Sequence, residues 1–189
     1  KTKTITGIVE HAVRSGRYSG LPGRILLLSF SRKAVSEIRE RLSPVTSSSV
    51  QVMTFHSFCY RALVASHPRF ASAPLQLLDE DSRNRIAAEF LIDKKDIIGG
   101  IPFSMIINGS KRVRTMFPEL LKQMDSHINT IKSINGLLEY DDLIRLMIQG
   151  LRDREDWCTS LFSAFDLVLV DEFQLRTDAR ARGAGELVE

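Results

Sequence analysis

Two uninterrupted aliphatic runs constrain the fold of this 189-residue chain more than any other feature. One lies within residues 25–30 (ILLLSF), and the other is LVLV at residues 167–170. A strand with one solvent-facing side alternates apolar and polar residues, whereas a strand covered on both faces is apolar throughout. The two runs therefore predict buried strands of a parallel sheet, and with it an α/β fold.

The segments beside the first run have helical spacing. Residues 5–13 place apolar side chains on one helical stripe before a loop rich in glycine, and residues 32–42 form a second amphipathic pattern. A short strand at 50–53 follows, and then a helix whose N-cap we expect to be Thr54. Strands and helices alternating at this spacing predict right-handed crossovers within one parallel sheet.

The middle of the chain has a different pattern. Residues 75–163 contain amphipathic helices and no strand-like alternation, and the buried-strand pattern resumes near Phe165. We therefore expect a sheet domain formed by 1–74 and 164–174, with an all-helical insertion at 75–163. Residues 175–189 lack apolar periodicity and are expected to be an irregular tail, or non-native sequence.

Composition limits the class of protein. Hydrophobic residues make up 43% and charged residues 26%, values typical of a globular protein, and a formal charge of +3 permits a nucleic-acid partner. Two cysteines without metal-ligand spacing favour a reducing compartment, and the apolar runs are too short to span a bilayer. We therefore expect a cytoplasmic protein with no membrane partner.

The second aliphatic run ends in two acids, Asp171 and Glu172. Parallel strands deliver their last residues to the edge of the sheet where α/β proteins bind ligands. There Asp171 could hold Mg²⁺ while Glu172 orients or deprotonates water that attacks a phosphoanhydride. The alternative is that the two acids only solvate the strand end or cap a helix.

A site for Mg²⁺ and nucleotide also needs a phosphate cradle of glycine-rich backbone, a lysine and a hydroxyl. The chain begins Lys1-Thr2 and continues into the first helical pattern, which is how a GxxxxGKT loop would end. The glycines of such a loop are absent, and a solvated Lys-Thr pair is the alternative.

Five landmarks occur in a familiar order: KTKTITGIVEHAV, LLLSFSRKAVSEIRERL, VQVMTFHSFCYRAL, LLEYDDLI and LVLVDEFQ. This order resembles the first motor domain of UvrD/Rep-type superfamily 1 DNA helicases, over about residues 1–174. The resemblance implies a RecA-like P-loop NTPase sheet flanked by helices, with the helical block as the inserted 1B subdomain.

The resemblance also implies roles at the nucleotide, with ATP and Mg²⁺ as cofactors. Lys1 would contact the β and γ phosphates, and Thr2 and Asp171 would hold the metal. Glu172 would be the catalytic base, and Gln174 would link the nucleotide state to the DNA.

Two clusters of hydroxyl and aromatic residues are expected to bind single-stranded DNA, each at a helix start that follows a strand. Hydroxyls can donate to phosphates, lysine adds charge, and aromatic rings offer stacking faces to unpaired bases. The first cluster departs from the family pattern, because Arg32 replaces the usual asparagine. The predicted DNA-binding residues are Ser29, Phe30, Ser31 and Lys33, and Thr54, Phe55, His56 and Ser57.

Other interpretations remain open for several of these side chains. Phe30 and Phe58 could be core aromatics, His56 could be a partly buried histidine, and the basic residues of 32–42 could form a solvated face. The basic cluster 110–114 could contact duplex phosphates or lie in a surface loop. Asp141 and Asp142 are read as the start of a helix.

The chain also departs from the family after Gln174, where Leu175-Arg176 replaces the usual polar continuation. The second RecA-like domain and the later motifs are absent from the sequence. We therefore expect an incomplete motor, truncated or engineered, with little or no ATPase or unwinding activity alone.

Three functional classes are consistent with these features. The first is part of an ATP-dependent 3′-to-5′ DNA helicase or translocase acting on single strands and junctions, for example in DNA repair, or the motor of a RecB/AddA-type helicase-nuclease. The second is a noncatalytic single-strand-binding module. The third is another P-loop NTPase that moves no DNA.

Overall fold

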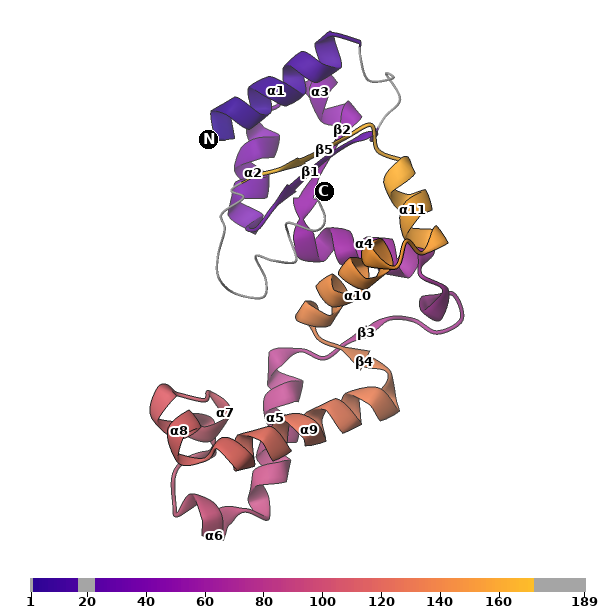
Figure 1. Cartoon of the computed structure of the whole chain (residues 1–189). Helices are drawn as coiled ribbons and strands as arrows, with labels where there is room; N and C mark the ends of the chain where they lie inside the picture. The colour runs from indigo at the N-terminus through magenta and orange to yellow at the C-terminus, as the bar shows by residue number, and fades with distance from the viewer. Residues whose placement is uncertain (1, 17–22, 172–189) are drawn as a thin grey trace. The chain divides into compact units, whose positions relative to one another are not determined.

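The computed structural model of the chain describes residues 2–16 and 23–171 (Figure 1). It divides into two compact units. The first, unit 1, comprises Lys1–Pro74 and Tyr140–Glu189, and the second, unit 2, comprises Leu75–Glu139.

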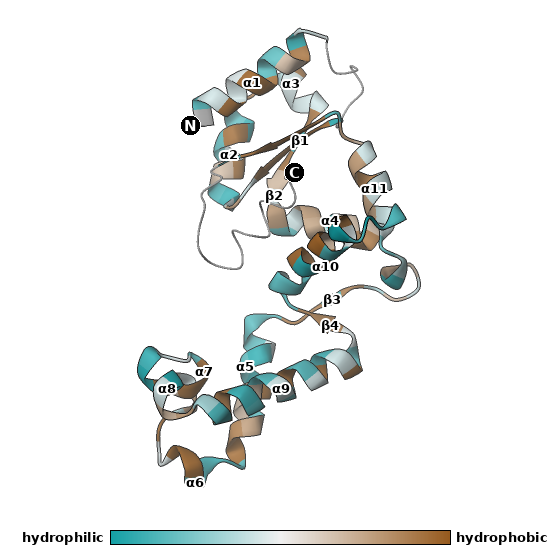
Figure 2. Cartoon of the chain, viewed as in Figure 1, coloured by the Kyte–Doolittle hydropathy of each residue, from teal (hydrophilic) through white to brown (hydrophobic). Residues whose placement is uncertain are grey.

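Unit 1 contains a parallel sheet whose strands are ordered β2-β1-β5. These strands are Val50–Thr54, Ile25–Ser29 and Leu167–Val170. In their register, Leu27 of β1 lies opposite Val52 of β2 and Leu169 of β5. Strand β1 is apolar along most of its length (Figure 2), and all five of its residues are buried. The predicted parallel α/β sheet flanked by helices is confirmed.

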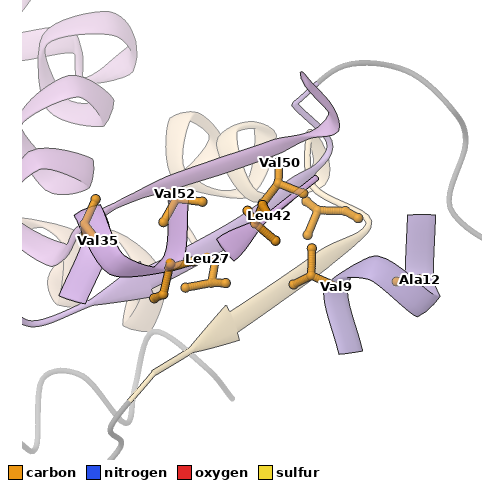
Figure 3. Close-up of a cluster of buried hydrophobic side chains, with 9 residues drawn as sticks. Val9, Ala12, Leu27, Val35, Leu42, Val50 and Val52 are labelled. Carbon is orange, nitrogen blue, oxygen red and sulfur yellow. The ribbon is translucent and has the colours of Figure 1, made fainter. Parts of the chain in front are cut away.

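One face of this sheet packs on helices α1 (Thr2–Arg14) and α2 (Arg32–Arg41), while helix α3 (Pro44–Ser49) contacts α1 and β2. Alternate residues of a strand point to opposite faces, so Ile25 and Leu27 of β1 contribute to this side. Figure 3 shows the resulting apolar cluster between the strands and helices. Its buried members are Val9, Ala12, Ile25, Leu27, Val35, Ile38, Leu42, Val50 and Val52.

The other helices of unit 1 are α4 (Phe55–Ser66), the 3-10 turn η1 (Pro68–Phe70), α10 (Tyr140–Arg152) and α11 (Asp156–Ser163). Helix α10 contacts both α4 and α11. It approaches α11 closely at Gly150, where a Cβ would lie only 2.5 Å from Cζ2 of Trp157. These contacts join α10 to the sheet unit.

Unit 2 is mainly helical. Its helices are α5 (Glu80–Ile92), α6 (Lys95–Ile98), α7 (Phe103–Ile107), α8 (Lys111–Met116) and α9 (Pro118–Asn135). Two-residue strands β3 (Gln76–Leu77) and β4 (Leu137–Leu138) pair in parallel at its ends. Its core is a separate cluster that includes Leu91, Ile106 and Ile128.

The structure differs from the sequence expectation in two places. The expected helical insertion ends at residue 163, whereas unit 2 ends at Glu139, because α10 and α11 pack with α4. Unit 2 is not all-helical, since it contains β3 and β4. Residues 44–49 form helix α3, which begins at Pro44 and is capped by the Ser43 hydroxyl.

Among the described helices, none combines the length and the apolarity that crossing a membrane requires.

Candidate functional site

Three polar residues stand at the carboxyl ends of the three neighbouring strands of unit 1. Ser29 ends β1 and lies opposite Thr54, which ends β2. Asp171 directly follows β5, and its N–H donates to the Leu28 carbonyl oxygen at 2.8 Å. The register therefore brings Ser29, Thr54 and Asp171 to one edge of the sheet, where ligands of α/β proteins bind.

Asp171 is the predicted nucleotide-site residue whose side chain the structure describes, and it is 3% exposed. Glu172, Gln174 and Lys1 lie outside the described residues, and Thr2 is described only as the first residue of α1. A single protein carboxylate suits Mg²⁺, which keeps several waters and takes few protein ligands. The chemistry of Asp171 therefore fits the metal that the sequence predicts there.

The loop after β1 presents the first expected DNA-binding cluster. Ser31 is the N-cap of α2, and its Oγ accepts from the Ala34 N–H at 3.0 Å. Phe30 is 45% exposed, and Lys33 is exposed in the first turn of the helix. Hydroxyl, ring and ammonium groups thus reach the surface within four consecutive positions. The core interpretation of Phe30 is wrong, whereas Phe58, at 3% exposure, is a core residue.

The junction at which β2 passes directly into α4 presents the second cluster. Thr54 is the predicted N-cap, and its Oγ1 accepts from the Ser57 N–H at 3.2 Å. The Thr54 hydroxyl donates in turn to Ser57 Oγ at 2.9 Å, so the Ser57 hydroxyl keeps its own hydrogen for another acceptor. His56 is half-buried and meets the Tyr140 ring edge-on, with centroids 5.6 Å apart.

A pair of phenylalanines connects the two clusters. The ring centroids of Phe30 and Phe55 lie 4.8 Å apart with a tilt of 38°. Phe55 is 2% exposed, so it supports Phe30 from inside the molecule and does not itself reach the surface. Phe30 is therefore a ring with one packed side and substantial exposed area, which is what a stacking platform for a base requires.

The sequence predicts that Ser29 contacts DNA, and this expectation is wrong because the residue is fully buried. Its Oγ has no hydrogen-bond partner within residues 2–16 and 23–171. A buried hydroxyl without a partner costs about 1–3 kcal/mol. Ser29 thus lies beneath the surface that its neighbours Phe30 and Ser31 present.

We expect Ser29→Ala to stabilise the protein by roughly 1 kcal/mol, because the change removes that polar atom and leaves a methyl group in an apolar strand. Urea unfolding followed by fluorescence of Trp157, the single tryptophan, measures the change within unit 1. Thr46→Ala is the matched control, since Thr46 is equally a buried hydroxyl but is hydrogen-bonded to Ser43, and it should destabilise. Destabilisation by Ser29→Ala would show that the hydroxyl has a partner in the native chain.

Two features of the site had little signal in the sequence. Tyr140 is far from His56 along the chain and meets it only because α10 packs on α4. A hollow beside β2 is formed in part by Arg32, Arg39 and Arg61, which come from two different helices. The spacing of Arg32 and Arg39 along one helical stripe was the available signal for that hollow.

The thiols of Cys59 and Cys158 and the ring of His67 lie outside the two predicted DNA-binding clusters. Burial raises the pKa of Cys59 to about 12 and that of Cys158 to about 11, so both are protonated thiols at neutral pH. Burial also lowers the pKa of His67, whose ring packs against Trp157 at 4.9 Å. These side chains are packing residues rather than reactive groups.

Curated proteins that resemble the chain are much longer than it is. A probable DNA helicase II homolog of Mycoplasma capricolum is 26% identical over 92% of the chain and 27% of that protein. The ATP-dependent DNA helicase PcrA of Leuconostoc citreum is 25% identical over 95% of the chain and 26% of that protein. The ATP-dependent DNA helicase UvrD2 of Mycobacterium bovis is 24% identical over 96% of the chain and 30% of that protein.

The chain therefore spans between a quarter and a third of the length of these relatives. The profile of one protein family, described as UvrD/REP helicase N-terminal domain, matches residues 1–182, which is nearly the whole sequence. The parallel sheet flanked by helices is consistent with that match. The chain belongs to the UvrD/REP helicase N-terminal domain family.

Proposed function

We propose that this chain is part of the first motor domain of an ATP-dependent DNA helicase or translocase, and that it binds single-stranded DNA across the strand-to-helix junctions that follow β1 and β2. Unit 1 is the RecA-like domain 1A, and unit 2 is the main part of the inserted 1B subdomain. The full motor moves 3′ to 5′ and includes a second RecA-like domain. Family membership and the similar DNA helicases support this assignment.

One observation carries the DNA-binding part of the proposal. Two strand-to-helix junctions lie side by side, each with a hydroxyl N-cap, Ser31 or Thr54, and the exposed ring of Phe30 packs on Phe55 between them. Helix N-termini carry partial positive charge and unpaired N–H groups that attract phosphates. Adjacent phosphate donors and a stacking face are the two components of sequence-independent single-strand binding.

The proposed nucleotide site lies at the same edge of the sheet, on the β5 side of β1. Asp171 supplies a buried carboxylate for Mg²⁺ at the end of β5. When bound, Mg²⁺ supplies charge neutralisation for the phosphates of ATP. In the proposed motor Lys1 would contact the phosphates, and Thr2 would hold the metal together with Asp171. Glu172 would be the catalytic base for the attacking water, and Gln174 would link the nucleotide state to the DNA.

The test is a titration of fluorescently labelled oligonucleotides with the protein, read by anisotropy at several salt concentrations. We expect the protein to bind a single strand more tightly than a duplex of the same length, because stacking on Phe30 needs an unpaired base. Binding should weaken as salt rises, with a slope of about −0.7 per phosphate contacted. Duplex binding at least as tight as single-strand binding, or no binding by protein that circular dichroism shows to be folded, would contradict the proposal.

A further inference from the structure

A basic hollow lies between α2 and α4 beside strand β2, and we call it the arginine pocket. Its volume is about 330 Å³. It is lined by Arg32, Val35, Ser36, Arg39, Met53, Thr54, Ser57 and Arg61. Three lining residues are arginines, three carry hydroxyls, and none is an acid.

Helix geometry explains why these side chains converge. Arg32, Ser36 and Arg39 are spaced by four and three residues, so they follow one stripe of α2. Ser57 and Arg61 are four residues apart on α4 and face that stripe. All three arginines are exposed, while the apolar floor of the pocket comes from buried residues, Val35 and Met53.

The positive charges of the arginine pocket are not neutralised by acids in the described part of the chain. Arg14, Arg24 and Arg83 each form an ion pair with a carboxylate, whereas Arg32 and Arg61 do not. Glu40 is not a lining residue, but its carboxylate accepts from the hydroxyl of the lining residue Ser36 at 3.2 Å. Guanidinium groups are cations, so three of them in one hollow repel one another unless an anion lies between them.

The donors of the pocket are partly held in place. Arg39 donates through Nη2 to the Val52 carbonyl oxygen at 2.5 Å, which fixes its guanidinium against β2 and leaves other N–H groups for a ligand. Ser57 accepts from the Thr54 hydroxyl, so its own hydrogen can be donated. Guanidinium forks together with a hydroxyl donor are the groups that recognise a phosphate.

We propose that the arginine pocket binds a backbone phosphate of the same DNA strand whose base stacks on Phe30. This inference rests on the proposed function and extends the DNA path past the strand ends onto the β2 side of unit 1. Thr54 and Ser57 belong both to the pocket and to the second cluster, so the two sites are continuous. The pocket is separate from the nucleotide side, because β1 lies between β2 and β5.

The size of the pocket fits this ligand. Sites for small molecules measure about 300–1,000 Å³, so a volume of about 330 Å³ is at the lower end of that range. A volume of this size accommodates a phosphodiester and its adjoining sugar. Its lining also has no aromatic ring, so it offers phosphate recognition without base recognition.

The experiment compares two labelled oligomers of equal length, one of thymidines and one made entirely of abasic sites. The double variant Arg32→Gln, Arg61→Gln removes two pocket charges and leaves the Arg39 anchor in place. Arg41→Gln is the matched control, because Arg41 is an exposed arginine of the same helix outside the pocket. We expect the double variant to weaken both oligomers by roughly tenfold and to reduce the salt slope by about 0.7, with little change for Arg41→Gln.

Phe30→Ala separates this inference from the proposed function, because it should weaken the thymidine oligomer and leave the abasic oligomer unchanged. If the wild type binds and only Phe30→Ala weakens it, the pocket assignment is overturned while the proposed function stands. If the wild type binds neither oligomer, both are overturned. Tripolyphosphate is a further probe, added as a competitor of the labelled oligomers. If its binding depends on Arg32 and Arg61 while the double variant binds both oligomers as tightly as the wild type, the pocket binds free phosphates and the inference is overturned.

Discussion

Replacing Leu27 with alanine is expected to lower the free energy of unfolding of unit 1 by about 2–5 kcal/mol, the range found for large-to-small changes in close-packed cores. Leu27 is 0% exposed at the centre of β1, and its neighbours on both sides, Val52 and Leu169, come from the two flanking strands. A cavity there cannot be filled from solvent, and the surrounding helices can close it only by moving against the sheet. The loss should appear as a lower midpoint of urea unfolding, monitored by Trp157 fluorescence.

Val45→Ala is the control for this prediction, because Val45 belongs to the same unit and is 73% exposed. A surface change of this kind should alter stability by no more than about 0.5 kcal/mol. If Leu27→Ala and Val45→Ala had equal effects, the packing described for the sheet would be wrong.

Phe30→Ala is expected to weaken binding of a thymidine oligomer by roughly 5- to 150-fold, which corresponds to about 1–3 kcal/mol for one stacked base. The ring is 45% exposed and is held by Phe55 at a centroid distance of 4.8 Å, so a base can stack on a surface that is already ordered. The change should alter affinity much more than its salt dependence, because no phosphate contact is removed. Anisotropy titrations at three salt concentrations distinguish the two effects.

Val64→Ala is the comparison for the Phe30 variant. Val64 is also 45% exposed in unit 1 and lies in α4, away from the strand ends. It should leave the affinity unchanged within about twofold. An equal loss of affinity in the two variants would mean that Phe30 affects binding through the general stability of the fold. In that case Phe30→Trp, which keeps a stacking face, should fail to restore affinity.

Long elements with a clear pattern were predictable from the sequence. The buried run that became β1 could be recognised because no polar residue interrupts it, and the Thr54 cap because a hydroxyl stands between a strand and a helical pattern. The position of Asp171 at the sheet edge followed from the same reasoning. These features depend on local sequence, so local rules sufficed for them.

Features that depend on contacts between distant segments were not predictable. Strands β3 and β4 have two residues each, which is too short for any alternation to be visible. The amphipathic stripe of α10 would look the same whether the helix packed on α4 or within unit 2, so the boundary at Glu139 had no local signal. Helix α3 is a short run of serine, threonine and valine after a proline, a composition that indicates a turn as readily as a helix.

The candidate site shows the same limit. Ser29 belongs to a polar cluster in sequence, yet pairing with β2 and β5 buries it. Arg32 and Arg61 come from helices that are separated in sequence by α3 and β2, and the glutamates between the arginines of α2 made that helix look like a solvated face. Only the packing of α2 and α4 beside β2 shows that these charges face one hollow.

The contact between Arg39 and the Val52 carbonyl oxygen has a consequence for self-association. Strand β2 has a single neighbour, β1, among the described strands, so its outer edge resembles a template on which another polypeptide could add a strand. A charged guanidinium that occupies a backbone acceptor beside such an edge discourages this pairing, as edge lysines do in other sheets. We therefore expect loss of the Arg39 side chain to favour self-association of unit 1, and to do so first in concentrated solutions, where chains meet often.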